Sequence, residues 1–299
     1  MTGAFACMVD RFPEMPVCRF FGKPMPRFFA KLLFLVLALP VFAAAVPARA
    51  ESGTEAVFDH STVRLVDGGI VDGRRMAGVD VRLGEGWKTY WRVPGDSGTP
   101  PVFDWSRSRN LKRATVLWPA PARYADLETG ETIGYKDRVV FPVIVEPEDP
   151  TSPVVLHLVM DYALCNEMCV PARAEVERVL TPAGGGEDAE LVRRWLERVP
   201  GPPREDFRVV DVQVRKAERR PRLFVTVRGK GLDERTEIFV EGPPLASFCH
   251  PRFVSSGNGR AVYYLPIDGI SDSAEMKGEK LRLTVISGER RIEQEVELP

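Results

Sequence analysis

The sequence has no excess of either charge sign. Its 299 residues carry 41 lysines and arginines against 42 aspartates and glutamates, which argues against a protein that holds nucleic acid by general electrostatic attraction. Only three histidines occur, with no histidine cluster, no Cys-x-x-Cys pair and no glycine-rich phosphate loop. The familiar signatures of zinc sites and of nucleotide sites are therefore missing.

Long hydrophobic runs are also lacking after residue 50. The apolar run Leu32 to Leu39 is too short to span a bilayer, follows two basic residues and precedes the small-x-small triplet Ala48-Arg49-Ala50. This pattern predicts a secretory signal peptide over residues 1–50, cleaved after Ala50, and Met25 suits the true start of such a segment. The alternative is an uncleaved N-terminal anchor.

Export changes the charge and the cysteine count. Residues 1–50 hold six of the 41 basic and two of the 42 acidic residues, so the mature chain has a net charge of -5. Three of the five cysteines remain: Cys165, Cys169 and Cys249. An oxidising compartment favours a disulfide between cysteines that lie close together.

The 26 prolines and 25 glycines, many of them beside short apolar runs, favour strands and turns over a helical bundle. We predict an all-β fold of two immunoglobulin-like β-sandwiches joined by a short helix. The predicted boundaries are 51–183 for the first sandwich, 184–203 for the linker helix and 204–299 for the second sandwich. Within the linker, the apolar spacing of Val192, Trp195, Leu196 and Val199 is that of a helix face.

The chemistry of the sequence concentrates at Cys165 and Cys169, which follow an apolar strand and are separated by three residues. The pair could exchange with a partner thiol, staple the loop, or bind Cu(I) with help from Met168, Met160 or His157. A disulfide that closes so short a loop would add little to stability, since it removes little conformational entropy from the unfolded chain. No other cofactor is expected.

Several motifs resemble the periplasmic N-terminal domain of the thiol:disulfide interchange protein DsbD, in its ScsB-like (suppressor of copper sensitivity) branch. The resemblance covers residues 55–182 strongly and residues 204–299 loosely. The motifs that carry it are GWKTYWRVPGDSGTPP from Gly86 to Pro101, FDWS from Phe103, LWPAP from Leu117, IGY from Ile133, VFP from Val140 and the Cys165/Cys169 segment with Val170-Pro171-Ala172.

This resemblance implies a periplasmic redox domain in which Cys169 attacks a partner disulfide and Cys165 resolves the product. It also implies links to copper tolerance and cytochrome c biogenesis. The reductant is expected on another chain, either a membrane thiol transporter or a thioredoxin-like protein, because this sequence carries neither part itself. Disulfide-containing periplasmic proteins would be the clients. The rival hypothesis is a non-enzymatic copper-handling or adaptor module with a structural disulfide.

A cap loop shields the cysteines in the family, and the matching stretch here is about Tyr124 to Thr132. The phenylalanine that covers the sulfurs in DsbD is absent, and Tyr124 or Leu127 could replace it. Tyr90, Asp126 and Tyr135 are further candidates to border the pair.

Two other features have simpler explanations. Trp87, Tyr90, Trp91, Trp105 and Trp118 could form a sugar or peptide platform, but core packing explains them better. Cys249 and His250 are adjacent and would point to opposite faces of a strand, so we expect Cys249 to be a buried small apolar residue.

Overall fold

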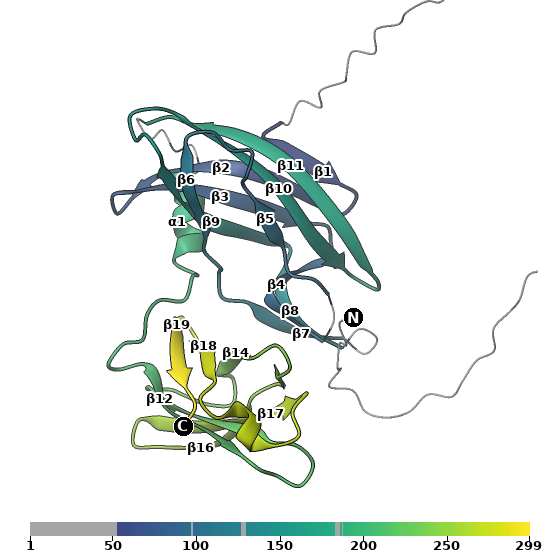
Figure 1. The fold of residues 1–299 in the computed structure, drawn as a ribbon, viewed down its shortest axis with the longest axis vertical. Coiled ribbons are helices and arrows are strands. Elements are labelled where there is room, and N and C mark those ends of the chain that lie inside the picture. Colours follow the sequence, from purple (N-terminus) through teal and green to yellow (C-terminus); the bar gives the residue numbers. More distant parts are fainter. Residues whose placement is uncertain (1–52, 97, 127–129, 183–185, 187) are drawn as a thin grey trace, which may run out of the picture. The chain divides into compact units, whose positions relative to one another are not determined.

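The computed structural model describes residues 53–96, 98–126, 130–182, 186 and 188–299 (Figure 1). The expected signal peptide, its cleavage site after Ala50 and the alternative start at Met25 lie outside these residues. No helix in the described part of the chain is long and apolar enough to cross a membrane.

Two antiparallel sheets form the first sandwich (Figure 1). The first sheet has the strand order β1 (Glu55–Phe58), β2 (Ser61–Val71), β3 (Arg74–Leu83), β9 (Arg138–Pro147) and β6 (Leu111–Val116). The second has the order β11 (Cys169–Leu180), β10 (Val154–Cys165), β4 (Lys88–Gly95), β8 (Gly130–Lys136) and β7 (Ala122–Asp126), with β5 (Val102–Asp104) paired to β10.

The core lies between these two sheets, as the apolar pattern of their central strands requires. Val139, Val140 and Phe141 of β9 are all fully buried, although neighbouring side chains of a strand point to opposite faces. Both faces of this strand are therefore covered, as its continuous apolar run predicts. Trp91 of β4 lies in the same core, and the aromatic ring of Trp118 packs edge-on against that of Phe141. Core packing thus accounts for these tryptophans.

Helix α1 (Ala189–Leu196) covers the outer face of the first sheet. Val192, fully buried, packs against Val66 of β2 and Met76 of β3. Gly78 of β3 makes room for it, because a Cβ at this position would lie 3.1 Å from Val192 Cγ2 and 2.9 Å from Val66 Cγ2. The helix predicted for the linker thus packs on the first sandwich and is shorter than its apolar spacing indicated.

The second sandwich also consists of antiparallel strands. One sheet has the order β12 (Arg208–Arg215), β13 (Arg222–Arg228), β17 (Arg260–Asp268) and β15 (Ser247–Phe248), with β16 (Arg252–Gly257) paired to β17. The other has the order β14 (Glu237–Glu241), β18 (Lys280–Ser287) and β19 (Arg290–Glu297). Alternate residues of β13 are buried, so one face of this sheet is covered and the other is at least partly exposed to solvent. The predicted fold class is confirmed, whereas the exact domain boundaries stay predictions.

A buried carboxylate stabilises the first sandwich. Asp80 of β3 is 1% exposed and accepts hydrogen bonds from Arg138 Nε at 2.8 Å and Arg138 Nη2 at 2.9 Å. Arg64 Nη2 of β2 is a third donor, at 3.3 Å. Because Asp80 has little access to water, these two arginines supply the solvation that its charge needs.

Replacing Asp80 by alanine is expected to lower the free energy of unfolding by about 3 kcal/mol, since it leaves the partly buried Arg138 without the carboxylate that it binds. Asp161→Ala is the matched control, because Asp161 pairs with Arg173 on the surface, where both side chains are more than half exposed. The control should cost less than about 1 kcal/mol. Urea unfolding followed by tryptophan fluorescence measures both, and equal losses would contradict the assignment.

Candidate functional site

The two cysteines of interest lie at the tip of the long hairpin formed by β10 and β11 (Figure 1). Cys165 ends β10, Cys169 begins β11, and the two are direct partners across the antiparallel ladder. Asn166 N donates to Met168 O at 3.2 Å and closes the three-residue turn. Directly opposed residues of an antiparallel pair have Cα atoms about 4.5–5.5 Å apart, which is within the range that a disulfide spans.

The two sulfur atoms are close and differ in exposure. Cys165 Sγ and Cys169 Sγ lie 3.0 Å apart, and both residues are free thiols. Cys165 is fully buried, whereas Cys169 is exposed. A disulfide has an S–S length of about 2.05 Å, so the pair can oxidise after the sulfurs approach by about 1 Å. The arrangement offers one sulfur to an incoming partner and keeps the other behind it.

Tyr90 of β4 lies beside the pair. Its hydroxyl oxygen is 2.9 Å from Cys169 Sγ, and its side chain is fully buried. Burial, followed by the hydrogen bonds to Cys165 and Cys169, raises the pKa of the Tyr90 hydroxyl far above its usual value of 10.0. Tyr90 therefore keeps its proton at every physiological pH and donates a hydrogen bond to sulfur when the thiol ionises.

Lys88 lies across from Cys165, since strands β4 and β10 pair these two residues directly. Burial has the largest effect on the pKa of the Cys165 thiol and raises it, and the hydrogen bond with Cys169 raises it further. The Tyr90 hydroxyl and the Lys88 ammonium group lower the pKa of the Cys165 thiol. Lys88 is itself buried, with 8% of its surface exposed. These two groups thus offset part of the cost of ionising a buried thiol.

The other predicted neighbours lie elsewhere. Tyr135 points into the core, where its hydroxyl donates to Pro119 O at 2.7 Å, so its expected place beside the cysteines is wrong. Tyr124 is half-buried near Lys136 and Asp137, and burial raises its pKa. Among the described residues, neither sulfur of the pair forms a hydrogen bond with Tyr124. The side chain of Asp126, and all of Leu127, lie outside the described residues.

The sequence reasoning missed Lys88 and Gly98 as neighbours of the site. Both lie within the motif Gly86 to Pro101, two residues before and eight residues after Tyr90. The motif was the only sequence signal for these two residues. It does not say which of its side chains face the cysteines, because that depends on how the strands pair.

The described geometry offers little support for a Cu(I) site. Met160 is fully buried in the core, and His157 is held by Glu175 and Glu177, at 3.0 Å and 3.3 Å from its ring nitrogens. Met168 is 68% exposed at the hairpin tip. In the part of the chain that the structure describes, no three His, Cys, Asp or Glu side chains are grouped to hold a metal ion.

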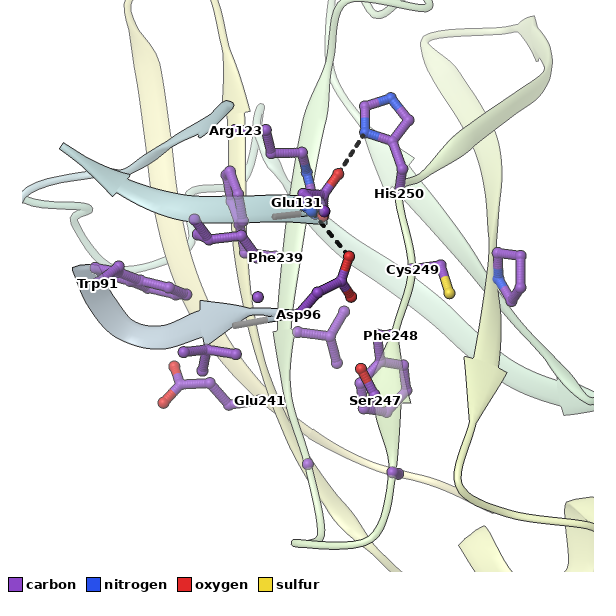
Figure 2. A pocket seen from close by; sticks show the side chains of 18 of the residues that line it. Trp91, Asp96, Arg123, Glu131, Phe239, Glu241, Ser247, Phe248, Cys249 and His250 are labelled. Carbon is purple, nitrogen blue, oxygen red and sulfur yellow. Dashed lines mark hydrogen bonds and ion pairs between the residues drawn. The ribbon is translucent and has the colours of Figure 1, made fainter. Parts of the chain in front are cut away.

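Cys249 does not fit the prediction of a buried apolar residue. It is partly exposed, and its Sγ lies 3.3 Å from Asp268 Oδ2. Figure 2 shows its side chain and that of His250 pointing in different directions, so the two do not form a nucleophile and base.

A hollow with a volume of about 610 Å³ lies away from the cysteine pair. Trp91, Asp96, Glu131, Phe239 and Cys249 are among the residues that line it (Figure 2). Neither Cys165 nor Cys169 lines it. The cysteine pair itself lies at the tip of the β10–β11 hairpin.

Fold and site together define a class, namely an immunoglobulin-like sandwich that presents a dithiol at the tip of a hairpin. Residues 65–181 match the family described as the N-terminal domain of the thiol:disulfide interchange protein DsbD. The resemblance of this part of the chain to the N-terminal domain of DsbD, read from the motifs, is confirmed. Residues 198–299 match a family described as Domain of unknown function (DUF8393).

One similar solved structure is the N-terminal periplasmic domain of ScsB from Proteus mirabilis, with 20% identity and a TM-score of 0.64. The match covers 82% of this chain and 96% of that one, and shows a common fold. A marsupial T cell receptor also matches, with 10% identity, a TM-score of 0.18, and coverage of 81% of this chain and 98% of that one. No curated protein matches the sequence.

Proposed function

We propose that this protein is a periplasmic thiol–disulfide exchange protein that passes reducing equivalents to client proteins through Cys165 and Cys169. One observation carries the proposal: the exposed Cys169 sulfur lies 3.0 Å from the buried Cys165 sulfur at a hairpin tip. The family of residues 65–181 and the periplasmic origin of the similar ScsB domain support it.

In the first step the Cys169 thiolate attacks one sulfur of the client disulfide. A mixed disulfide forms between Cys169 and the client, the client's S–S bond breaks, and the second client sulfur leaves as a thiolate that takes up a proton. The exposure of Cys169 allows this approach, whereas Cys165 cannot be reached while it is fully buried.

In the second step the Cys165 thiolate attacks Cys169 Sγ and expels the client as a dithiol. The client has then gained two electrons and two protons, and this protein holds a Cys165–Cys169 disulfide. The 3.0 Å separation means that the resolving sulfur is already next to its target. A dithiol reductant on another chain, of the thioredoxin-like or membrane transporter kind, would restore the pair.

The Cys165→Ser variant should trap the first intermediate. Mixed with glutathione disulfide, it is expected to retain one glutathionyl group on Cys169, because no thiol remains to displace it. The wild-type protein should release the glutathione and form its internal disulfide. Peptide mapping by mass spectrometry identifies the modified residue. A persistent adduct on the wild-type protein would contradict the resolving role of Cys165.

The reduction potential separates exchange from a structural staple. A pair that exchanges with periplasmic partners should equilibrate near about -200 mV, whereas a structural disulfide lies below about -300 mV. Titration against glutathione redox buffers, with the thiols quenched by alkylation, measures this value. Tight Cu(I) binding by the reduced pair without any exchange would favour the copper-handling alternative.

A further inference from the structure

The outer face of one sheet in the second sandwich carries two rows of arginine. Alternate residues of β13 and β17 are buried, so the residues between them point away from the core. Arg208 of β12, Arg228 of β13 and Arg260 of β17 are successive ladder partners and form one row. Arg215 of β12 and Arg222 of β13 are partners in the same ladder and form the second row. Both ends of β12 and of β13 therefore present arginine on this face.

A row of aromatic side chains lies between the two arginine rows. Phe224 of β13 and Tyr264 of β17 are ladder partners, and their ring centroids are 6.0 Å apart. The guanidinium carbon of Arg215 lies 4.6 Å from the centre of the Phe224 ring, and that of Arg222 lies 4.8 Å from the centre of the Tyr264 ring. Arg252 of β16 is the other ladder partner of Tyr264. Stacking occupies the flat side of a guanidinium group and leaves the N–H donors at its edge available to an anion.

This face has little opposing charge. Its strands β12, β13, β16 and β17 hold two aspartates, Asp211 and Asp268, and Asp268 is paired with Arg220 of the loop between β12 and β13. The same strands hold six arginines, which define the arginine face: Arg208, Arg215, Arg222, Arg228, Arg252 and Arg260.

The arginine face costs the fold stability. Arg228 and Arg260 stand directly opposite each other, and neither forms an ion pair with a carboxylate of the described residues. Like charges at directly opposed positions destabilise an antiparallel pair of strands. An anionic surface laid on this face would neutralise that repulsion.

The edge of the sheet indicates which anionic surface fits. Strand β16 carries two large apolar side chains beside Arg252, namely Phe253, which is 36% exposed, and Val254, which is 49% exposed. Arginine next to exposed apolar and aromatic side chains is the composition of a surface that lies in a membrane interface. An acidic protein would match the charge of the face but gives no reason for the apolar edge.

We propose that the arginine face docks this protein on a bilayer surface that contains anionic phospholipid. The guanidinium groups bind headgroup phosphates, and Phe253 and Val254 enter the interface at the edge of the sheet. The inference concerns the second sandwich and goes beyond the exchange chemistry of the cysteine pair. A failure of the exchange would leave it standing, because neither cysteine takes part in docking.

Flotation with lipid vesicles tests the proposal on residues 51–299, the expected mature chain. The wild-type protein should bind vesicles of equal parts phosphatidylglycerol and phosphatidylcholine, and should not bind vesicles of phosphatidylcholine alone. Arg228→Gln/Arg260→Gln should weaken binding about 25-fold, since each arginine near an anionic surface contributes about fivefold. Added salt should weaken binding as well, because it screens exposed charges.

Arg113→Gln/Arg235→Gln is the matched control, because it removes the same charge away from the arginine face. Both residues are exposed and paired: Arg113 Nη1 lies 3.9 Å from Glu146 Oε1, and Arg235 Nη2 lies 2.6 Å from Asp233 Oδ2. This variant should keep the wild-type affinity. Equal losses in the two double variants would overturn the proposal, since net charge would then explain the binding. Equal binding to both kinds of vesicle would overturn it too.

Stability separates docking from a structural role. Because Arg228 and Arg260 repel each other, Arg228→Gln/Arg260→Gln should keep or raise the urea midpoint, followed by circular dichroism. Lost binding together with a lowered midpoint would show that these arginines stabilise the sheet, and would overturn the proposal. Binding to poly-L-glutamate without binding to the anionic vesicles would also overturn it, in favour of an acidic protein partner.

Discussion

Replacing Cys169 by serine is expected to reduce thiol–disulfide exchange to the uncatalysed background, whereas Cys165→Ser should leave the first step intact. The difference follows from exposure, because Cys169 is exposed and Cys165 is fully buried behind it. A serine hydroxyl does not ionise near neutral pH and cannot replace the thiolate as the nucleophile. Stopped-flow measurement of a chromogenic aromatic disulfide, read by the thiolate that it releases, gives the rate of the first step.

The pair of variants is its own control, since both remove one sulfur from the same hairpin. Similar unfolding curves for the two proteins would show that the hairpin is intact. If Cys169→Ser retained the wild-type rate and Cys165→Ser lost it, the roles of the two cysteines would be exchanged. If both retained it, the exchange would not depend on this pair.

Removing either group that favours the Cys165 thiolate is expected to slow the resolving step about tenfold near pH 7. The Lys88 ammonium group and the Tyr90 hydroxyl both lower the pKa of Cys165, so Lys88→Met and Tyr90→Phe should each raise it. A higher pKa leaves less thiolate at neutral pH, and a tenfold effect is what a hydrogen bond to a charged group of about 1.5 kcal/mol gives. The deficit should shrink as the pH rises, because the thiol then ionises in the variants as well.

Two substitutions in the same sandwich serve as matched controls. Lys136→Met removes an exposed lysine of β8, the residue that pairs with Lys88 in the ladder between β4 and β8. Tyr162→Phe removes a buried hydroxyl that is bonded to Ser61 Oγ at 2.7 Å. Both should keep the wild-type rate of glutathione release between pH 6 and pH 9. An unchanged rate in Lys88→Met and Tyr90→Phe would show that the thiolate of Cys165 needs neither group.

Part of this site could be predicted from the chain alone, because part of it is local. Cys165 and Cys169 are four positions apart after an apolar strand, and a tight hairpin brings such residues together whatever the rest of the fold does. The turn residues and short apolar runs likewise predicted a β-sandwich, since alternation along a strand is itself a local property. The neighbours of the pair are different, because they come from other strands.

Tyr90 and Tyr135 show why the rest required the structure. Both were predicted to border the cysteines, and both lie in the same sheet, but β4 and β8 pair Tyr90 with Gly134 and Tyr135 with Thr89. Because side chains alternate between faces, this register turns Tyr135 into the core and leaves Tyr90 at the sulfurs. Nothing in the sequence specifies that register, since it depends on strands far apart in the chain.

The sequence by itself determined the class of fold, the close pair of cysteines and the resemblance of the first sandwich to the DsbD N-terminal domain, since these depend on local pattern and on recognisable motifs. Only the tertiary structure decided which sulfur is exposed and which groups tune the buried one. The pairing of β4 with β10 brings Lys88 and Cys165 together. Burial raises the pKa of the Cys165 thiol, and Tyr90 and Lys88 lower it again in part. Such effects depend on distance and solvent exclusion in the folded chain.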